Sequence, residues 1–319
     1  MRWNWKQFVA VVIIIGVSWM LVQLPVISHY IYTLKSHYIP VIANKNSLLE
    51  EIKKKAELYS IPPQDAKIDP IWKTVPGYNG LEVDIEESFN NMEEDGVFDE
   101  KKLVFHQISP KKHLEDLPPA PIYRAHPEKP VASFLINVAW GNEYLKDMLS
   151  TLKKHDVKAT FFLEGKWTKN NPEFAKMIAE AGHEIGNHSY SHPNMKLLGS
   201  EATMQELKET NEIIRAVTGV TCIWFAPPSG SYSEVTVKKA AELNMRTIMW
   251  SVDTIDWQKP APHVLVERVV SKVHNGAFIL MHPTESTSVS LETLILNIKK
   301  KGIRLTTVSE ALKEKRMFR

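Results

Sequence analysis

Cysteine and net charge are what this chain of 319 residues has least of. Its single cysteine, Cys222, excludes an internal disulfide framework and any metal site built from several cysteines. Because Cys222 lies in an apolar run that ends at Phe225, a buried thiol is favoured over a nucleophile. The formal net charge of +2 argues against nucleic acid as a partner. From Glu82 to Glu100 lysine and arginine are absent while carboxylates are frequent, which favours a solvated helix face over a calcium site.

Charge is also absent from Phe8 to Leu24, an apolar stretch that Arg2 and Lys6 precede. Cations before an apolar segment hold that end in the cytoplasm and send the following chain across the membrane. The stretch therefore indicates a cleaved signal peptide or an uncleaved anchor, with the anchor slightly favoured. We expect residues 1–43 to form this segment and the remainder to be extracytoplasmic, either membrane-anchored or secreted.

Residues 44–120 predict a small α/β module followed by a linker. Apolar spacing indicates helices over Asn44–Leu58 and Asp84–Glu94, and a strand over Leu103–Ile108. The proline-rich segment Leu117–Pro121 then predicts a stiff connection to a third region, residues 121–319. The pattern assigns no function to this module.

From Val131 onward, strand and helix patterns alternate, which predicts an α/β fold with a parallel sheet. With about seven such units, we expect a distorted (β/α)7-type barrel rather than an open sheet. The expected strands are Ala132–Val138, Ala159–Leu163, Glu184–Asn187, Cys222–Ala226, Arg246–Trp250, Ala277–Met281 and Ile303–Val308. The expected helices are Glu143–His155, Glu173–Ala181, Glu201–Val217, Ser233–Leu243, Pro262–Val273 and Val289–Lys301. Active sites of such barrels lie at the C-terminal ends of the strands, where His188, Asp253 and His282 fall.

His188 and His192 are four positions apart and directly follow a short predicted strand. On one helical turn, residues i and i+4 face the same way, so both imidazoles can reach one metal ion. Imidazole suits zinc and its first-row neighbours. The same spacing also occurs in polar loops with two solvated histidines, so the neighbouring motifs have to decide between the two.

Residues from Val131 to about Leu312 resemble the polysaccharide deacetylases of the NodB-homology type. The resemblance rests on the order and spacing of three motifs: His188-Ser189-Tyr190-Ser191-His192, Asp253-Thr254-Ile255-Asp256-Trp257 and Leu280-Met281-His282. It implies a distorted (β/α) barrel and a metal-dependent hydrolase that removes N-acetyl groups from peptidoglycan or chitin-like sugars. The motif departures resemble most those of a deacetylase-like protein associated with sporulation. Residues 44–120 lie outside the resemblance.

The resemblance also implies a role for each matching residue. His188 and His192 would hold a divalent metal such as zinc or cobalt. Asp253 would orient and tune His282, and His282 would act as the general acid that protonates the leaving amine. A carboxylate beside an imidazole raises the pKa of the imidazole, which an acid working near neutral pH requires. The implied partner is peptidoglycan or another N-acetylated glycan.

Two motifs of the family are altered in this chain. The first normally ends a strand with two aspartates, the general base and the third metal ligand, but Ala139 and Trp140 stand there. In the other, Ala226 stands in place of an arginine that braces the base, and Ser229 in place of an aromatic residue. An arginine without its carboxylate would be an unpaired buried charge, which costs several kcal/mol. Ala139 and Ala226 are therefore interpreted as one coupled change.

These losses leave two hypotheses. The first is an impaired or inactive homologue that binds a glycan or a partner protein, with or without a metal. The second is an active N-deacetylase in which Asn142 or Glu143 replaces the missing ligand or base. Losing general-base assistance alone costs about 10²–10⁴-fold in rate, so the first hypothesis is favoured.

Aromatic residues near these motifs are candidate glycan contacts, because an aromatic ring can stack on the face of a sugar. The expected substrate-binding residues are Trp140, Pro228 and Trp257. Three further tryptophans either add to this lining or fill the core and its rim: Trp167, Trp224 and Trp250.

Overall fold

The computed structural model describes residues 5–22 and 24–317. The chain divides into two compact units, residues 1–61 with 81–106 and residues 62–80 with 107–319. This division differs from the expected boundary after residue 120, because residues 62–80 and 107–120 belong to the large unit.

The small unit contains two long helices and a short α/β element. Helix α1 is Trp5–Val22 and helix α2 is Pro25–Tyr59, so α2 begins well before the start expected at Asn44. The remaining elements are β3 (Gly80–Asp84), α3 (Ile85–Met92), η1 (Glu100–Lys102) and β4 (Val104–Ile108), with β3 paired to β4. A core of Leu48, Ile52, Ala56, Val83, Met92 and Leu103 holds the unit together.

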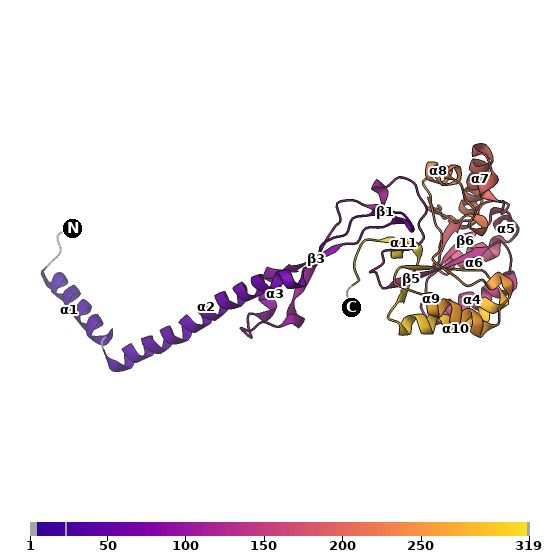
Figure 1. Ribbon diagram of the computed structural model, residues 1–319. Coiled ribbons are helices and arrows are strands. Elements are labelled where there is room, and N and C mark those ends of the chain that lie inside the picture. The colour runs from indigo at the N-terminus through magenta and orange to yellow at the C-terminus, as the bar shows by residue number, and fades with distance from the viewer. Residues whose placement is uncertain (1–4, 23, 318–319) are drawn as a thin grey trace. The chain divides into compact units, whose positions relative to one another are not determined.

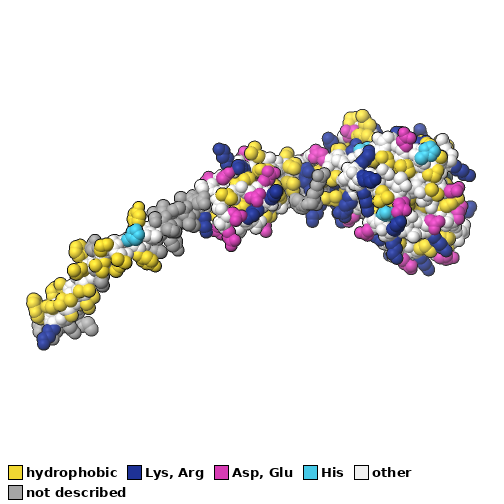
Figure 2. All heavy atoms as spheres, turned by 90° about the horizontal axis from the view of Figure 1, so that it is seen from below, with side chains coloured by type: hydrophobic (Ala, Val, Ile, Leu, Met, Phe, Trp, Pro, Cys, Tyr) yellow, Lys and Arg dark blue, Asp and Glu magenta, His cyan; other side chains and the backbone are white. Residues whose placement is uncertain are grey.

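Exposed hydrophobic side chains cover α1 and the first turns of α2 (Figure 2). Trp19 is 69% exposed and Met20 is 70% exposed. Neither described helix meets the length and hydropathy of a membrane span by itself, whereas Phe8–Met20 and Pro25–Thr33 meet them together as a bent pair. The membrane or signal segment expected over residues 1–43 therefore stays a prediction.

The large unit is organised around a sheet of eight strands, β5 to β12, whose pairs all run parallel. The strands are β5 (Val131–Val138), β6 (Thr160–Leu163), β7 (Glu184–Asn187), β8 (Trp224–Phe225), β9 (Arg246–Thr247), β10 (Val252–Asp253), β11 (Ala277–Met281) and β12 (Arg304–Leu305). Their order is β10-β11-β5-β6-β7-β8-β9, with β12 also paired to β5. Among the described residues, the two end strands, β9 and β10, are not paired with each other. The sheet therefore curls into a half-barrel without closing.

Helices cover the curled sheet (Figure 1). They are α4 (Asn142–Lys154), α5 (Gly165–Asn170), α6 (Pro172–Glu180), α7 (Ser200–Thr218), α8 (Glu234–Glu242), α9 (Pro262–Lys272), α10 (Glu285–Lys300) and α11 (Val308–Leu312). Short 3-10 turns η2 (Leu114–Asp116), η3 (Met195–Leu197), η4 (Pro228–Gly230) and η5 (Asp256–Gln258) lie in the loops, and β1 (Lys67–Asp69) pairs antiparallel with β2 (Lys73–Val75). The expected distorted α/β barrel is confirmed in its architecture, with the correction that its sheet stays open.

The central strand explains why the site lies where it does. All eight residues of β5 are buried, as expected of a strand in a parallel sheet that is covered on both faces. Because the paired strands are parallel, their C-terminal ends meet at one edge of the sheet. Ala139 follows β5 there, His188 follows β7, and His282 follows β11.

Several strands are shorter than expected, and strand β10 was not predicted. The strand expected over Arg246–Trp250 ends at Thr247, and β10 begins only at Val252. Beyond β9 the pairing is continued by Ile122, whose N–H donates to Thr247 O at 2.9 Å and whose carbonyl accepts from Met249 N at 2.8 Å. The segment after the expected linker is thus part of the sheet edge.

Candidate functional site

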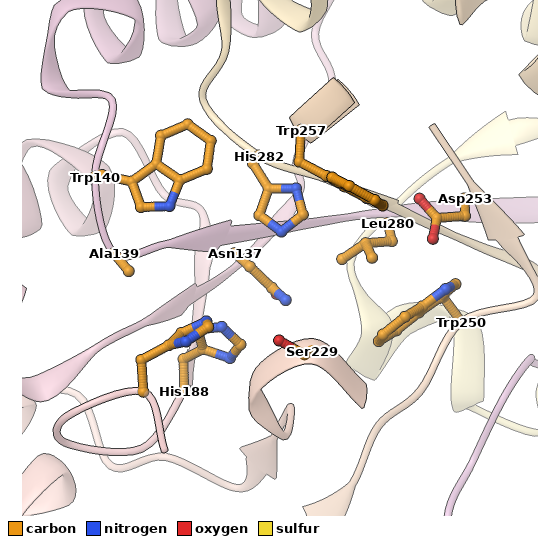
Figure 3. Close-up of a pocket in the computed structure, with 11 residues that line it drawn as sticks. Asn137, Ala139, Trp140, His188, Ser229, Trp250, Asp253, Trp257, Leu280 and His282 are labelled. Carbon is orange, nitrogen blue, oxygen red and sulfur yellow. The ribbon is translucent and has the colours of Figure 1, made fainter. Parts of the chain in front are cut away.

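A hollow of about 500 Å³ opens at the C-terminal ends of the central strands (Figure 3). Its lining combines aromatic rings, histidines and a few other polar groups: Asn137, Ala139, Trp140, His188, His192, Ser229, Trp250, Asp253, Trp257, Leu280 and His282. The fold thus brings the expected residues from four separate loops together, as the parallel strand order requires.

The two histidines of the first motif lie side by side in this hollow. His188 is 1% exposed, and its Nδ1 donates to the carbonyl of Ala226 at 2.7 Å, which leaves Nε2 available to a ligand. The rings of His188 and His192 are 5.1 Å apart at 71°. Burial lowers the pKa of His188 to about 3 and also lowers the pKa of His192. Both rings are therefore neutral near pH 7, which is the form that binds metals.

The pair does not share a helical turn, contrary to expectation. Ser189 and His192 adopt φ values of +62° and +57°, so the chain turns tightly between the two histidines. Glu206 of α7 holds this loop, because its carboxylate accepts from the N–H groups of Tyr190 and Ser191 at 2.8 and 2.9 Å. It also accepts from Ser191 Oγ at 2.7 Å. Glu206 is a positioning residue that no local motif indicated.

His282 is paired with Asp256, and the expected pairing with Asp253 is wrong. Nδ1 of His282 lies 2.8 Å from Oδ1 of Asp256, and its backbone N–H donates to Oδ2 at 2.6 Å. Asp256 is fully buried and also accepts from Thr287 Oγ1 at 2.6 Å. Asp253 instead accepts from the N–H of Ile255 at 2.8 Å and lines the hollow. The second aspartate of the motif therefore positions the histidine.

Trp140 packs flat against His282. The two ring centroids are 5.8 Å apart and the ring planes differ by 10° (Figure 3). The following residue, Gly141, has φ +84°, and a Cβ at this position would lie 2.0 Å from the carbonyl oxygen of Pro283. Only glycine lets the loop of Trp140 and the loop of His282 approach so closely. The close backbone contact therefore fixes how the Trp140 and His282 rings lie relative to each other.

Comparisons with known proteins agree with this architecture. The family model for polysaccharide deacetylase matches residues 124–248. The chain is 54% identical over 303 residues to the uncharacterized protein YlxY of Bacillus subtilis, covering 95% of each chain. It is 31% identical over 183 residues to the peptidoglycan-N-acetylmuramic acid deacetylase PdaA of Bacillus subtilis, covering 56% of this chain and 70% of that protein. The chain belongs to the polysaccharide deacetylase family.

A solved structure with high similarity bears on activity. The crystal structure of a protein from Bacillus anthracis, described as a CE4 family pseudoenzyme, is 56% identical and has a TM-score of 0.80, covering 85% of this chain and 96% of that one. A mutant of that protein, described as having restored enzymatic activity, is 55% identical with a TM-score of 0.81.

Within this member of the family, the replaced positions lie in or beside the hollow. Ala139 and Trp140 line it where the base and the third metal ligand are expected. Ala226 is 2% exposed, and its backbone carbonyl still accepts the hydrogen bond from His188. The replacement of an arginine side chain at this position therefore leaves the histidine anchored.

The donor set does not fit the three-ligand metal of the family. Among the described residues there is no group of three His, Cys, Asp or Glu side chains that could hold a metal ion. Neither expected substitute supplies a third ligand. The amide of Asn142 bonds to Asn171 Oδ1 and to the indole N–H of Trp167, each at 2.7 Å, and Glu143 lines a neighbouring hollow. Two neutral imidazoles remain.

Three tryptophans surround the hollow, two expected as sugar contacts and one left open. Trp140 and Trp257 are 46% and 56% exposed, and Trp250 is partly buried at the wall. Large, partly open indole faces of this kind suit stacking on an apolar ligand face. The other candidate contacts are buried and absent from the described lining: Trp167, Trp224 and Pro228.

Among the described residues, polar groups complete the hollow without a lysine or an arginine. The described lining has no lysine or arginine, and Asp253 is its only carboxylate. Asn137 is 4% exposed, and its Oδ1 has no hydrogen-bond partner among the described residues. Ser229, in left-handed backbone conformation with φ +53°, adds a hydroxyl. Indole faces with an amide, a hydroxyl and imidazoles can hold a sugar by stacking and hydrogen bonding.

Proposed function

We propose that this chain is a catalytically impaired polysaccharide deacetylase that binds a cell-wall glycan in the hollow. One observation carries the proposal. Trp140 occupies the position of the third metal ligand and lies beside His282 with its ring nearly parallel, at 5.8 Å between ring centroids. An indole neither ligates a cation nor accepts a proton, so the general acid is retained beside a residue that can take no part in hydrolysis.

The missing groups account for a loss of rate. Removing a general base costs about 10²–10⁴-fold. Catalytic zinc sites use three protein ligands plus an open position, so a pair of imidazoles binds a metal more weakly. The two effects act on the same step, because the base and the metal both prepare the attacking water. We therefore expect an activity close to background.

The lining supports glycan binding, and the relatives indicate the class of glycan. Indole rings and neutral hydrogen-bonding groups are what a hexose requires. PdaA is named as a peptidoglycan deacetylase, and the Bacillus anthracis protein as a pseudoenzyme. The proposed ligand is accordingly peptidoglycan or a related hexosamine polymer. The uncharged stretch near the N-terminus favours an extracytoplasmic location, anchored or secreted, where such a polymer is accessible.

Acetate release and glycan binding test the proposal together. The purified full-length chain is incubated with N-acetylglucosamine oligomers in the presence of zinc or cobalt. We expect no acetate above background, but a saturable heat of binding in calorimetry. Trp257→Ala should weaken that binding, since Trp257 lines the hollow with more than half of its surface open. Acetate release with turnover would overturn the impaired function, and absent binding of both acetylated and deacetylated oligomers would overturn the glycan-binding function.

An active enzyme with a rearranged metal site is the alternative. It is favoured by the surviving pair His188 and His192, and by the His282–Asp256 hydrogen bond of 2.8 Å. In that case the native chain would release acetate and His188→Ala would abolish the release. A rate unaffected by this substitution would remove the alternative, because no metal-dependent step could then involve the hollow.

A further inference from the structure

The fixed charge of the hollow comes from few groups. The resemblance implies a divalent cation, a bracing arginine and two aspartates at this place, and this chain lacks the arginine and both aspartates. Here the described lining has neither lysine nor arginine, and a carboxylate, Asp253, faces it. The other titratable residues of the lining are His188, His192 and His282. The fixed charge of the hollow is thus negative.

Asp253 is placed to meet a ligand rather than to serve the fold. Oδ1 accepts one hydrogen bond, from the N–H of Ile255 at 2.8 Å, and no side chain pairs with the carboxylate in the described structure. In Figure 3 the carboxylate lies at the edge of the hollow, beyond the end of the Trp257 ring and near Trp250, with its oxygens turned inward. A cation beside these indoles would gain both the carboxylate and the attraction of the ring faces.

Asn137 supplies a second polar group to the lining. Its Oδ1 is buried and has no hydrogen-bond partner among the described residues, so the amide is not tied to the fold through this oxygen. Asn137 lies on β5 and Asp253 on β10, with β11 paired between them. Two strand spacings of about 4.8 Å therefore separate them sideways, so one ligand can meet both with different groups.

An adjoining hollow, also of about 500 Å³, continues this character. Trp140 and Trp257 line both hollows, so a polymer that stacks on these indoles reaches each side. The second lining contains the exposed carboxylates Glu143 and Glu285 and one cation, Lys259. Carboxylates therefore outnumber lysine and arginine side chains in the described linings of the two hollows.

These observations distinguish two states of a hexosamine. An acetylated nitrogen carries one N–H donor and adds a carbonyl acceptor, whereas an ammonium carries three donors and a positive charge. The single N–H of the acetylated form can pair with Asp253 but leaves the charge of the carboxylate uncompensated, and the added carbonyl gains nothing from a carboxylate. An ammonium would satisfy the carboxylate in a site walled by indoles.

We propose that the hollow selects hexosamines whose nitrogen carries no acetyl group, so that the protein recognises the product of its active relatives. The inference rests on the glycan-binding function proposed above and narrows its ligand to a cationic amino sugar within a partly deacetylated polymer. It assigns Asp253 to ligand recognition, with Trp250 and Trp257 as the flanking rings.

Calorimetry with matched tetramers tests the inference. The full-length chain is titrated with glucosamine tetramer and with N-acetylglucosamine tetramer at about pH 6, where amines with an ordinary pKa near 7.7–8.0 are protonated. We expect the glucosamine tetramer to bind about tenfold more tightly, with the difference shrinking as salt is raised. Asp253→Asn should lower the affinity for the glucosamine tetramer about tenfold. It should change the affinity for the N-acetylglucosamine tetramer by less than about twofold.

Control variants distinguish a failure of this inference from a failure of the proposed glycan-binding function. Asp147→Asn, an exposed change on α4 outside both described linings, should leave both affinities unchanged, which excludes general attraction to an acidic surface. Trp257→Ala should weaken the binding of both tetramers. Equal or tighter binding of the acetylated tetramer overturns the selectivity alone. Failure of both tetramers to bind overturns the proposed glycan-binding function.

Discussion

The two sides of the hollow differ in how their residues are supported. One, the retained side, consists of His188, His192, Asp256 and His282. The other, the replaced side, consists of Ala139, Trp140 and Ala226. On the retained side each polar group is held from elsewhere. His188 bonds to a backbone carbonyl, the loop of His192 is held by Glu206, and Asp256 bonds to Thr287.

None of these supports needs a side chain from the replaced side. The contact from Ala226 to His188 is made by a carbonyl oxygen, which every residue has. Base, ligand and arginine can therefore be absent while the histidines keep their places. The comparison teaches that catalytic groups and the groups that position them are separable here. The following substitutions test that separation from either side.

The largest effect should come from refilling the replaced side. The triple variant Ala139→Asp, Trp140→Asp and Ala226→Arg supplies a base, a third ligand and a bracing cation while removing the indole from His282. We expect zinc to bind at one equivalent and acetate release to rise by at least about 10²–10⁴-fold, the contribution of a general base. Metal analysis and an acetate assay on chitin oligomers measure both.

A matched control uses the same triple variant with His188→Ala added. It should lose the metal and the activity together, because the retained histidine is then missing. If the triple variant folds but binds no zinc, the retained side is not preorganised and the separation argued above is wrong.

Breaking the retained side should chiefly affect stability. Asp256→Ala leaves the N–H of His282, its ring and the hydroxyl of Thr287 without their buried acceptor. Buried donors left unpaired each cost about 1–3 kcal/mol, so for three donors we expect a loss of at least about 3 kcal/mol in the free energy of unfolding by urea. Asp253→Asn, on the same loop, should change it by less than about 0.5 kcal/mol. An equal loss in both variants would contradict the distinct roles of the two aspartates.

The sequence predicted the fold and much of the lining, and its errors have identifiable causes. Asp253 ends the two-residue strand β10 and Asp256 lies three residues further on, and the left-handed backbone of Ile255, at φ +52°, decides which one turns toward His282. That angle is not visible in a motif. The loop of His188 likewise departs from a helix because Ser189 has φ +62°.

Glu206 could not be predicted for a different reason. It lies on α7, and it reaches the histidine loop only because α7 packs beside that loop in three dimensions. Trp140 and Trp257, by contrast, belong to motifs whose spacing is local, and both line the hollow. Residues adjacent to strand ends were predictable, whereas those that support them from helices were not.

Acid should weaken the framework that carries the retained side. His183 directly precedes β7, and burial lowers its pKa from 6.5 to about 4. Its Nδ1 accepts from the N–H of Ala159 at 3.2 Å, which requires a lone pair. The unfolded chain takes up this proton at a higher pH than the folded chain, so stability is present above 6.5 and is lost as pH falls toward 4.

We expect about 1–2 kcal/mol of unfolding free energy to be lost between pH 7 and pH 5 through this group, at about 1.4 kcal/mol for each pKa unit. Urea titrations at several pH values measure it. His183→Asn keeps an acceptor but gains no proton in this range, so its stability should depend less on pH. An unchanged slope in that variant would exclude His183 as the source.

The smallest effect should come from Glu206→Gln. The carboxylate accepts from two backbone N–H groups and one hydroxyl of the His192 loop, and an amide can accept at only one of its two atoms. We expect about 1 kcal/mol of stability to be lost and a weaker affinity for the glycan, because the His192 loop becomes less ordered while His188 keeps its carbonyl partner. Glu212→Gln, an exposed change on the same helix, should have almost no effect on either quantity. If both variants behave alike, the loop is held by its own backbone, and the retained side is more independent of the helices than the hydrogen bonds indicate.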